Sequence, residues 1–223
     1  MKGHWPWTLA AVAYLAFLGW YFNWQGPVAP EEVDELVAAM STNPGAVHTA
    51  PEVIRAFLEE DDGEEFVMLN LIRLYEGDIE HPETGASISP SALIAEYTGP
   101  FFLELLKRGG HPVQIAPRAG GNVDSWRYGT DPGWQAVSMV RYKSRRDLVE
   151  LMIDPRFADV HVYKLAAIEG TMSFPTRRNF TTFLSPAVFV PALLVLLASL
   201  AQNLLNWQSQ RAHQRDARSK PSG

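Results

Sequence analysis

Six polar or aromatic side chains in the middle of this 223-residue chain could together bind a small molecule. They combine an amide, two guanidinium groups, an imidazole and two aromatic rings, a set that suits a small polar or aromatic ligand. His161 could also exchange protons near neutral pH and so act as an acid or a base. The candidates are Asn70, Tyr97, Arg118, Trp134, Arg141 and His161, and His111 and Tyr163 fall on the same predicted elements.

Each candidate also has a purely structural interpretation. Asn70 could bond to neighbouring backbone at a strand edge or an interface, and Tyr97 and Trp134 could be core aromatics. The two arginines could be solvated or paired with carboxylates, and the histidine could simply face solvent. The sequence leaves both interpretations open for all six.

Recognisable catalytic and metal-binding motifs are missing from the sequence. The six histidines lie far apart, with no HxxxH or HxH spacing, so we expect no metal site. There is no cysteine, which excludes disulfides, thiolate ligands and cysteine nucleophiles. No GxSxG, Walker or GxGxxG pattern occurs, and Gly109-Gly110 and Gly120-Gly121 predict turns instead. We therefore expect no cofactor, and whether the chain is an enzyme stays open.

The hydrophobic pattern predicts one α+β domain in the middle of the chain. Residues 66–75 predict a first strand, and residues 91–108 predict a helix that bends at Gly99-Pro100. Further strands are predicted at 111–118, 134–142 and 167–174, and a second helix at 145–152 that resumes over 156–165. In the first strand, Phe66, Met68, Asn70 and Ile72 share one face, and Val67, Leu69, Leu71 and Arg73 share the other.

The predicted order β-α-β-β-α-β is that of the split βαβ, or ferredoxin-like, fold. Its antiparallel sheet carries both helices on one face, so something else must cover the other face. The cover could be a second copy, another protein or two short helices that precede the domain. The first of these helices is predicted at 31–40. The second begins at Pro51, where Thr49 and Glu52 have the spacing of a capping box.

Several short pieces follow one another through this domain: Met68-Leu69-Asn70-Leu71, Glu96-Tyr97, Gly109-Gly110, the Trp134 strand that runs into residues 140–145, Asp154-Pro155-Arg156-Phe157, and Ala166-Ala167. Together they resemble the family called domain of unknown function 1330, over about residues 65–174. The resemblance implies a dimeric α+β barrel in which two sheets pack face to face, and the family has no settled reaction. The chain departs from the family pattern at two positions. Gln135 stands where an acidic residue tends to follow the tryptophan, and Lys164 stands where an arginine tends to precede the paired alanines.

Each end of the chain carries an apolar segment of a length that can cross a membrane. Residues 5–24 are apolar, aromatic or small except Thr8 and Asn23, and aromatic residues gather at both ends of the segment. A cleaved signal peptide is the alternative, but the bulky aromatic end of the segment favours an uncleaved anchor. The second segment, 183–205, begins with Ser185 and Pro186 placed as N-cap and first-turn proline, and lacks a polar face.

Basic residues near the two segments predict their orientation. Lys2 precedes the first segment, the residues after that segment are acidic, and four basic residues follow the second segment. By the positive-inside rule both termini are then cytoplasmic and the central domain is extracytoplasmic. In a bacterium this would make the chain a two-pass protein of the cell inner (plasma) membrane. The four residues are Arg211, Arg215, Arg218 and Lys220.

The chain thus divides into five regions: an N-terminal transmembrane anchor (1–26), a helical lead-in (27–64), a ferredoxin-like domain (65–176), a C-terminal transmembrane helix (177–210) and a basic tail (211–223). The net charge is −6, and no basic stripe runs through the domain, so nucleic acid is not an expected partner. The expected partners are the membrane, a second copy of the chain and a small-molecule ligand.

Three classes of function fit these observations. A membrane-anchored small-molecule-binding or accessory module is favoured. A cofactor-independent small-molecule enzyme, of isomerase or monooxygenase type, is supported only by analogy with other α+β barrels, and a structural subunit of a membrane complex is the third class. We expect a ligand to bind in a cavity between sheet and helices that is lined by Asn70, Tyr97, Arg118 and His161.

Overall fold

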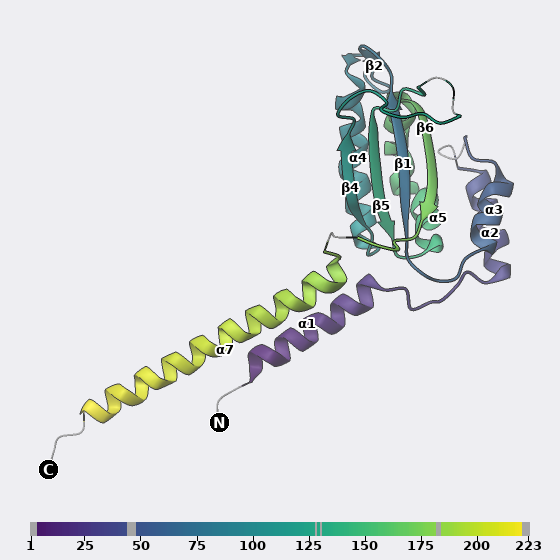
Figure 1. Ribbon diagram of the computed structural model, residues 1–223. Coiled ribbons are helices and arrows are strands. Elements are labelled where there is room, and N and C mark those ends of the chain that lie inside the picture. The colour runs from purple at the N-terminus through teal and green to yellow at the C-terminus, as the bar shows by residue number, and fades with distance from the viewer. Residues whose placement is uncertain (1–3, 44–47, 128, 130, 182–183, 220–223) are drawn as a thin grey trace. The chain divides into compact units, whose positions relative to one another are not determined.

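The computed structural model describes residues 4–43, 48–127, 129, 131–181 and 184–219 (Figure 1). The chain forms two compact units, one made of residues 22–179 and one made of the two terminal segments. Each unit is described by itself.

A four-stranded antiparallel sheet forms the centre of the larger unit, with the strand order β4-β5-β1-β6. In the register of the sheet Phe66 lies opposite Tyr142, and Asn70 lies opposite Ser173. The β4–β5 pairing shifts next to Pro112, whose nitrogen has no hydrogen to donate to the ladder. The mixed α+β architecture and its antiparallel sheet are therefore confirmed. The strands are β1 (Phe66–Leu74), β4 (His111–Pro117), β5 (Ala136–Tyr142) and β6 (Ile168–Thr176).

Three helices connect these strands, and local signals set their ends. Ser89 caps α4 (Pro90–Lys107) by accepting a hydrogen bond from the backbone N–H of Ala92 at 3.3 Å. Ser144 caps α5 (Arg145–Ile153) in the same way, accepting from the N–H of Asp147 at 3.1 Å. A new helix, α6 (Pro155–Ala167), follows directly, because Pro155 has no N–H to continue the hydrogen bonds of α5 and its fixed φ suits the first position of a helix. The predicted break between the two helices is confirmed.

The three helices share one face of the sheet with the main hydrophobic core, and Figure 1 shows α4 and α5 behind the strands. On the other face, Met172 and Phe174 of β6 are 53% and 43% exposed. They lie opposite Leu71 and Leu69, so this open face presents a stripe of apolar side chains. The core on the helix side is built from Phe66, Tyr97, Leu105, Val140, Tyr142, Leu148, Leu151 and Phe157.

The two lead-in helices, α2 (Pro30–Ser41) and α3 (Pro51–Glu59), pack on α5 in a second core around Val149. They do not cover Met172 and Phe174, which stay exposed. The helix at Pro51 begins where predicted, but the prediction of a capping box formed by Thr49 and Glu52 is wrong. Ala50 is the N-cap residue, and no side chain bonds to the helix end there. Pro51 itself has no N–H, which leaves one donor fewer in need of a cap.

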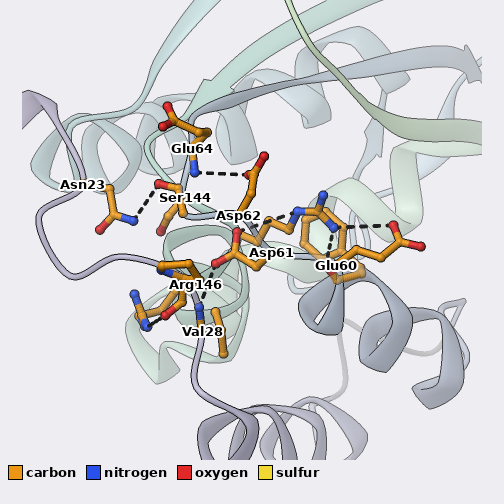
Figure 2. A network of polar contacts seen from close by, with 12 residues as sticks. Asn23, Val28, Glu60, Asp61, Asp62, Glu64, Ser144 and Arg146 are labelled. Carbon is orange, nitrogen blue, oxygen red and sulfur yellow. Dashed lines mark hydrogen bonds and ion pairs between the residues drawn. The ribbon is translucent and has the colours of Figure 1, made fainter.

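A polar network fixes the segment that precedes α2 to the rest of this unit (Figure 2). Asp61 accepts the backbone N–H of Val28 at 2.9 Å, and the Asn23 amide donates to two loop carbonyls at 2.9 and 3.1 Å. The Arg146 guanidinium is buried and pairs with Glu32 at the start of α2. These bonds hold the entry of the chain into the unit at several points.

A small hairpin between β1 and α4 was missed by the sequence analysis. It consists of β2 (Ile79–Glu80) and β3 (Ser87–Ile88), and the His81 side chain fixes its loop. Nδ1 of His81 accepts the backbone N–H groups of Glu83 and Thr84 at 3.1 and 3.3 Å, which assigns the ring proton to Nε2. Nε2 then faces Glu96 of α4 at 3.3 Å, so the hairpin is tied to that helix.

The terminal segments form α1 (Trp5–Tyr21) and α7 (Pro186–Ser219), which run side by side in opposite directions (Figure 1). In the part of the chain that the structure describes, one stretch, Pro186–Ala212, is long and apolar enough to cross a membrane. The predicted N-cap of this helix is confirmed, because Oγ of Ser185 accepts the N–H of Ala187 at 3.2 Å. α1 has 17 residues, the lower end of the length that spans a bilayer. Lys2 and Lys220, which entered the prediction of orientation, and Phe183 lie outside the described residues.

Candidate ligand-binding site

The structure distributes the six sequence-predicted candidates over several places in the larger unit. Tyr97 and His161 touch each other, and Arg118 contacts the backbone of Trp134. Asn70 and Arg141 lie on neighbouring strands, each with partners of its own. The contacts of each candidate decide which of them stays available to a ligand.

Asn70 lies on the helix-facing side of β1, and its amide bonds are made within the sheet. It donates to the carbonyl of Ser138 at 3.1 Å and to that of Met68 at 3.3 Å. Its oxygen accepts a hydrogen bond from the Ser173 hydroxyl at 2.7 Å. These contacts bridge β1 to both neighbouring strands, which is the structural role foreseen as the alternative for this residue.

Arg141 of β5 is almost completely buried and is paired with a carboxylate. Its guanidinium contacts Glu65 at 2.6 and 2.8 Å and donates to the carbonyl of Gly109 at 2.5 Å. Burial by itself would raise the pKa of Glu65, but the attraction and hydrogen bonds of Arg141 and of Arg178 lower that pKa overall. Gly109, with its positive φ of 78°, ends α4, so Arg141 fixes the turn from this helix into β4.

Arg118 holds together the long loop between β4 and β5. It donates to Asp131 at 2.6 Å, to the carbonyl of Trp134 at 3.2 Å and to Asn122 at 3.0 Å. The hydrogen bond from Arg118 lowers the pKa of Asp131. Arg118 is therefore paired with Asp131 where the loop begins. Its contact with Trp134 involves the backbone carbonyl of Trp134 and not the indole ring.

Tyr97 and His161 lie in a buried aromatic cluster between α4 and α6. They are 8% and 6% exposed, and their rings meet edge to face with centroids 5.8 Å apart. Phe157 contacts both of them, at 5.4 Å from Tyr97 and 5.6 Å from His161. The ammonium group of Lys164 lies over the Tyr97 ring, 5.8 Å from its centroid. Because His161 and Lys164 are three residues apart on α6, both project from the same side of that helix.

Burial sets the protonation of all three polar groups in this cluster. It lowers the pKa of His161 to about 4, with a further contribution from the charge of Lys164. Burial also lowers the pKa of Lys164 and raises that of Tyr97 well above its usual value. At neutral pH the imidazole and the phenol are therefore uncharged, and the amine loses its proton more readily than an ordinary lysine.

None of the three polar groups has a protein partner among the residues that the structure describes. The Tyr97 hydroxyl, the His161 ring nitrogens and the Lys164 ammonium make no hydrogen bond or ion pair there. Their polar atoms keep some contact with solvent, because the buried side-chain atoms without a partner in the described residues are Asp61 Oδ1, Arg73 Nε, Glu104 Oε2 and Gln202 Oε1. Three such groups side by side form a set that a ligand could satisfy. We refer to Tyr97, His161 and Lys164 as the α4–α6 site.

A separate cleft of about 360 Å³ lies at the end of β1 and contains none of the six candidates. Nε of Arg73 is 3.1 Å from Glu169, and Nη1 of Arg73 donates to the carbonyl of Pro132 at 3.0 Å. Gln135 also lines this cleft. Its side chain accepts from the N–H of Leu74 at 3.0 Å and donates to the carbonyl of Leu74 at 3.4 Å. An acidic side chain could not make both bonds, which gives a structural reason for the glutamine. The cleft is lined by Arg73, Tyr75, Glu76, Gly133, Gln135 and Glu169.

Comparison with known proteins finds similarity of fold and nothing more specific. No family model and no curated protein matches this chain. A crystal structure of the methylated protein RPA0582 is similar with a TM-score of 0.50 and 22% identity, over 61% of this chain and 97% of that one. A second structure of RPA0582, a protein of unknown function from Rhodopseudomonas palustris, has a TM-score of 0.49 and 21% identity, over 60% and 98% of the two chains. At such identities the likeness shows the fold alone.

Proposed function

We propose that this chain is a membrane-anchored small-molecule-binding or accessory module whose ligand binds at the α4–α6 site. The observation that carries this proposal is the presence of three adjacent polar groups, two of them on almost fully buried residues, without a protein partner. Asn70, Arg118 and Arg141, by contrast, all bond to other parts of the protein.

The surroundings of the three groups indicate the kind of ligand. The Tyr97 hydroxyl and the Lys164 ammonium are hydrogen-bond donors, so the ligand should carry acceptor atoms. The rings of Phe157 and Tyr97 offer apolar contact to the remainder of the molecule. A small molecule with a polar head and an apolar or aromatic body fits this description.

The proposal includes a ferredoxin-like domain of the dimeric α+β barrel type, in the family called domain of unknown function 1330. Support comes from the strand order β4-β5-β1-β6 and from the placement of the helices on one face. The exposed Met172 and Phe174 on the open face favour a second copy as its cover, since water penalises such a stripe. The lead-in helices, which pack on α5, are not available as that cover.

The proposal also includes two membrane spans and an extracytoplasmic central domain, in the cell inner (plasma) membrane of a bacterium. Support for the second span comes from Pro186–Ala212. Support for the first comes from the aromatic residues at both ends of α1 and from its apolar composition. The charge pattern around these segments favours two cytoplasmic termini.

Thermal unfolding of the full-length chain in mild detergent tests the site. A panel of small carboxylates, amides, aldehydes and phenols would be screened for compounds that raise the Tm. A compound bound at the α4–α6 site should raise the Tm of the wild type and have a much smaller effect on Tyr97→Phe or Lys164→Met. Lys107→Met is the matched control, because Lys107 is exposed and pairs with Glu104, three residues earlier on α4.

The control variant should respond to the compound as the wild type does. If a compound stabilises the two site variants as strongly as the wild type, the α4–α6 site is not where it binds. Co-purification of the chain with other membrane proteins in stoichiometric amounts, without any response to small molecules, would instead favour a structural subunit.

A further inference from the structure

The cleft at the end of β1 carries a pair of opposite charges on its wall. Its volume of about 360 Å³ lies in the usual range for small-molecule sites. Nε of Arg73 lies 3.1 Å from Oε2 of Glu169 but forms no hydrogen bond to it. The two side chains are 38% and 39% exposed, so a molecule in the cleft can reach both of them.

Each member of this ion pair has hydrogen-bonding capacity that the described protein does not use. Nη1 of Arg73 donates to the carbonyl of Pro132, but Nη2 donates to no described residue, and Glu169 accepts no hydrogen bond from one. Arg118, in contrast, has a bonded acceptor for every nitrogen of its guanidinium. Arg73 and Glu169 therefore present an unused donor and unused acceptors side by side.

Two glycines and a glutamine shape the surroundings of Arg73. A Cβ atom at Gly133 would come within 3.2 Å of Cδ of Arg73, and one at Gly170 would lie 3.7 Å from Nη2. Glycine at these positions leaves room for the arginine and keeps Nη2 uncovered on that side. The two bonds of Gln135 to the backbone of Leu74 hold the loop of Gly133 against the end of β1. The wall of the cleft is thus held by bonds that do not involve the unused groups.

We propose that this cleft is a second binding site, which holds a free α-amino acid with its carboxylate on Arg73 and its ammonium group on Glu169. An α-amino acid carries both charges on one carbon, so it matches two groups of opposite charge that lie side by side. Charge-assisted hydrogen bonds of this kind are about twice as strong as neutral ones. The cleft shares no residue with the α4–α6 site, so binding there is independent of the function proposed above.

The rest of the lining favours an amino acid over molecules with a single charge. Glu76 also lines the cleft, and no cation of the described chain pairs with it. With Arg73 and Glu169 the lining then carries two negative charges and one positive charge. A simple carboxylate is repelled by this balance, and a simple amine is attracted but leaves Nη2 unused. The exposed ring of Tyr75 offers apolar contact to the side chain of the amino acid.

Calorimetric titration of the full-length protein in mild detergent at pH 7 tests the proposal. Phenylalanine, leucine, serine and lysine serve as probes, because their side chains are aromatic, aliphatic, polar and cationic. The one that binds most tightly would be compared with the amine that lacks its carboxylate and with the acid that lacks its ammonium group. Each analogue should bind at least roughly tenfold more weakly, and the acid most weakly of the three. Absence of binding by all four amino acids would overturn the proposal, as would an acid that binds as tightly as the amino acid.

Two variants locate the binding. Arg73→Gln and Glu169→Gln each remove one charge, and each should weaken the binding at least roughly tenfold. Arg55→Gln is the matched control and should bind as the wild type does, since Arg55 pairs with Asp34 at 2.7 Å and lies outside the cleft. If Arg73→Gln does not fold, Glu169→Gln decides, because Glu169 makes no hydrogen bond with the described chain. Wild-type affinity in Glu169→Gln would contradict the proposal.

A third variant keeps this inference apart from the proposed function. Tyr97→Phe changes the α4–α6 site and should bind the amino acid as the wild type does. If Tyr97→Phe weakens the binding and Glu169→Gln does not, the amino acid occupies the α4–α6 site, which supports the proposed function and overturns this inference. If both cleft variants weaken the binding while no compound in the thermal screen distinguishes the wild type from Tyr97→Phe, the cleft is a ligand site and the α4–α6 site is not.

Discussion

The Lys164 ammonium lies over the ring of Tyr97, 5.8 Å from its centroid, and no carboxylate of the described chain neutralises it. His161 meets the same ring edge-on, also at 5.8 Å. A core built only for stability would fill this place with apolar side chains or pair the polar groups with each other. Polar groups that make no bond to the protein remain available to a ligand.

We predict that His161 makes the protein less stable in mild acid. Burial holds the pKa of His161 at about 4 in the folded protein, while an unfolded chain takes up this proton near pH 6.5. The contribution to stability is therefore complete above pH 6.5 and is lost as the pH falls from 6.5 toward 4. Between pH 7 and pH 5 the loss should be about 2 kcal/mol.

The measurement is the difference in unfolding free energy between pH 7 and pH 5, in the wild type and in His161→Gln. Lys164 on α6 and Tyr97 on α4 face the imidazole and stay in place in both proteins. The variant should lose less stability over this range. An identical pH dependence in the two proteins would mean that His161 takes up its proton equally in the folded and unfolded states.

We predict that the chain is a homodimer joined through the open face of the sheet. Met172→Asp would place a charge in the centre of that interface, and burying an unpaired carboxylate costs several kcal/mol. Light scattering in mild detergent should therefore find a dimer for the wild type and a monomer for this variant. Val53→Asp is the control, since Val53 is equally exposed but lies on α3. A monomeric wild type, or a variant that stays dimeric, would argue against this interface.

We predict that a reporter fused after Gly223 is cytoplasmic, while one fused after Asn179 is exported. The second fusion ends before α7, so the comparison tests that helix as a span. Alkaline phosphatase, which is active only outside the cytoplasm, should be active after Asn179 and inactive after Gly223. Activity at both positions would mean that α7 does not cross the membrane.

Much of the larger unit could be predicted because its elements carry their own local signals. Alternation along β1, the glycines after α4 and the proline after α5 all predicted boundaries that the structure confirms within a few residues. The hairpin of β2 and β3 was missed because two-residue strands show no periodicity, and His81 fixes their loop by bonds that spacing alone does not indicate.

The candidate site was harder to predict, because it depends on which segments meet. Glu65, the partner of Arg141, precedes it by 76 residues, so the sequence could not decide between a paired and a free arginine. Tyr97 and His161, two of the six candidates, are in contact, whereas Lys164 entered only as a departure from a family pattern. Arg73, Gln135 and Glu169 are brought together by the pairing of β1 with both of its neighbours, which no local pattern reveals.

A ligand can bind at the α4–α6 site only if its polar groups are not already bonded to the protein. The Tm of the ligand-free full-length chain, compared between wild type and Tyr97→Phe, measures this. If the hydroxyl has no protein partner, its removal should leave the Tm nearly unchanged. If the hydroxyl serves the fold, the same substitution costs about 1 kcal/mol and lowers the Tm by about 2–4 °C, and the α4–α6 site is then a part of the core.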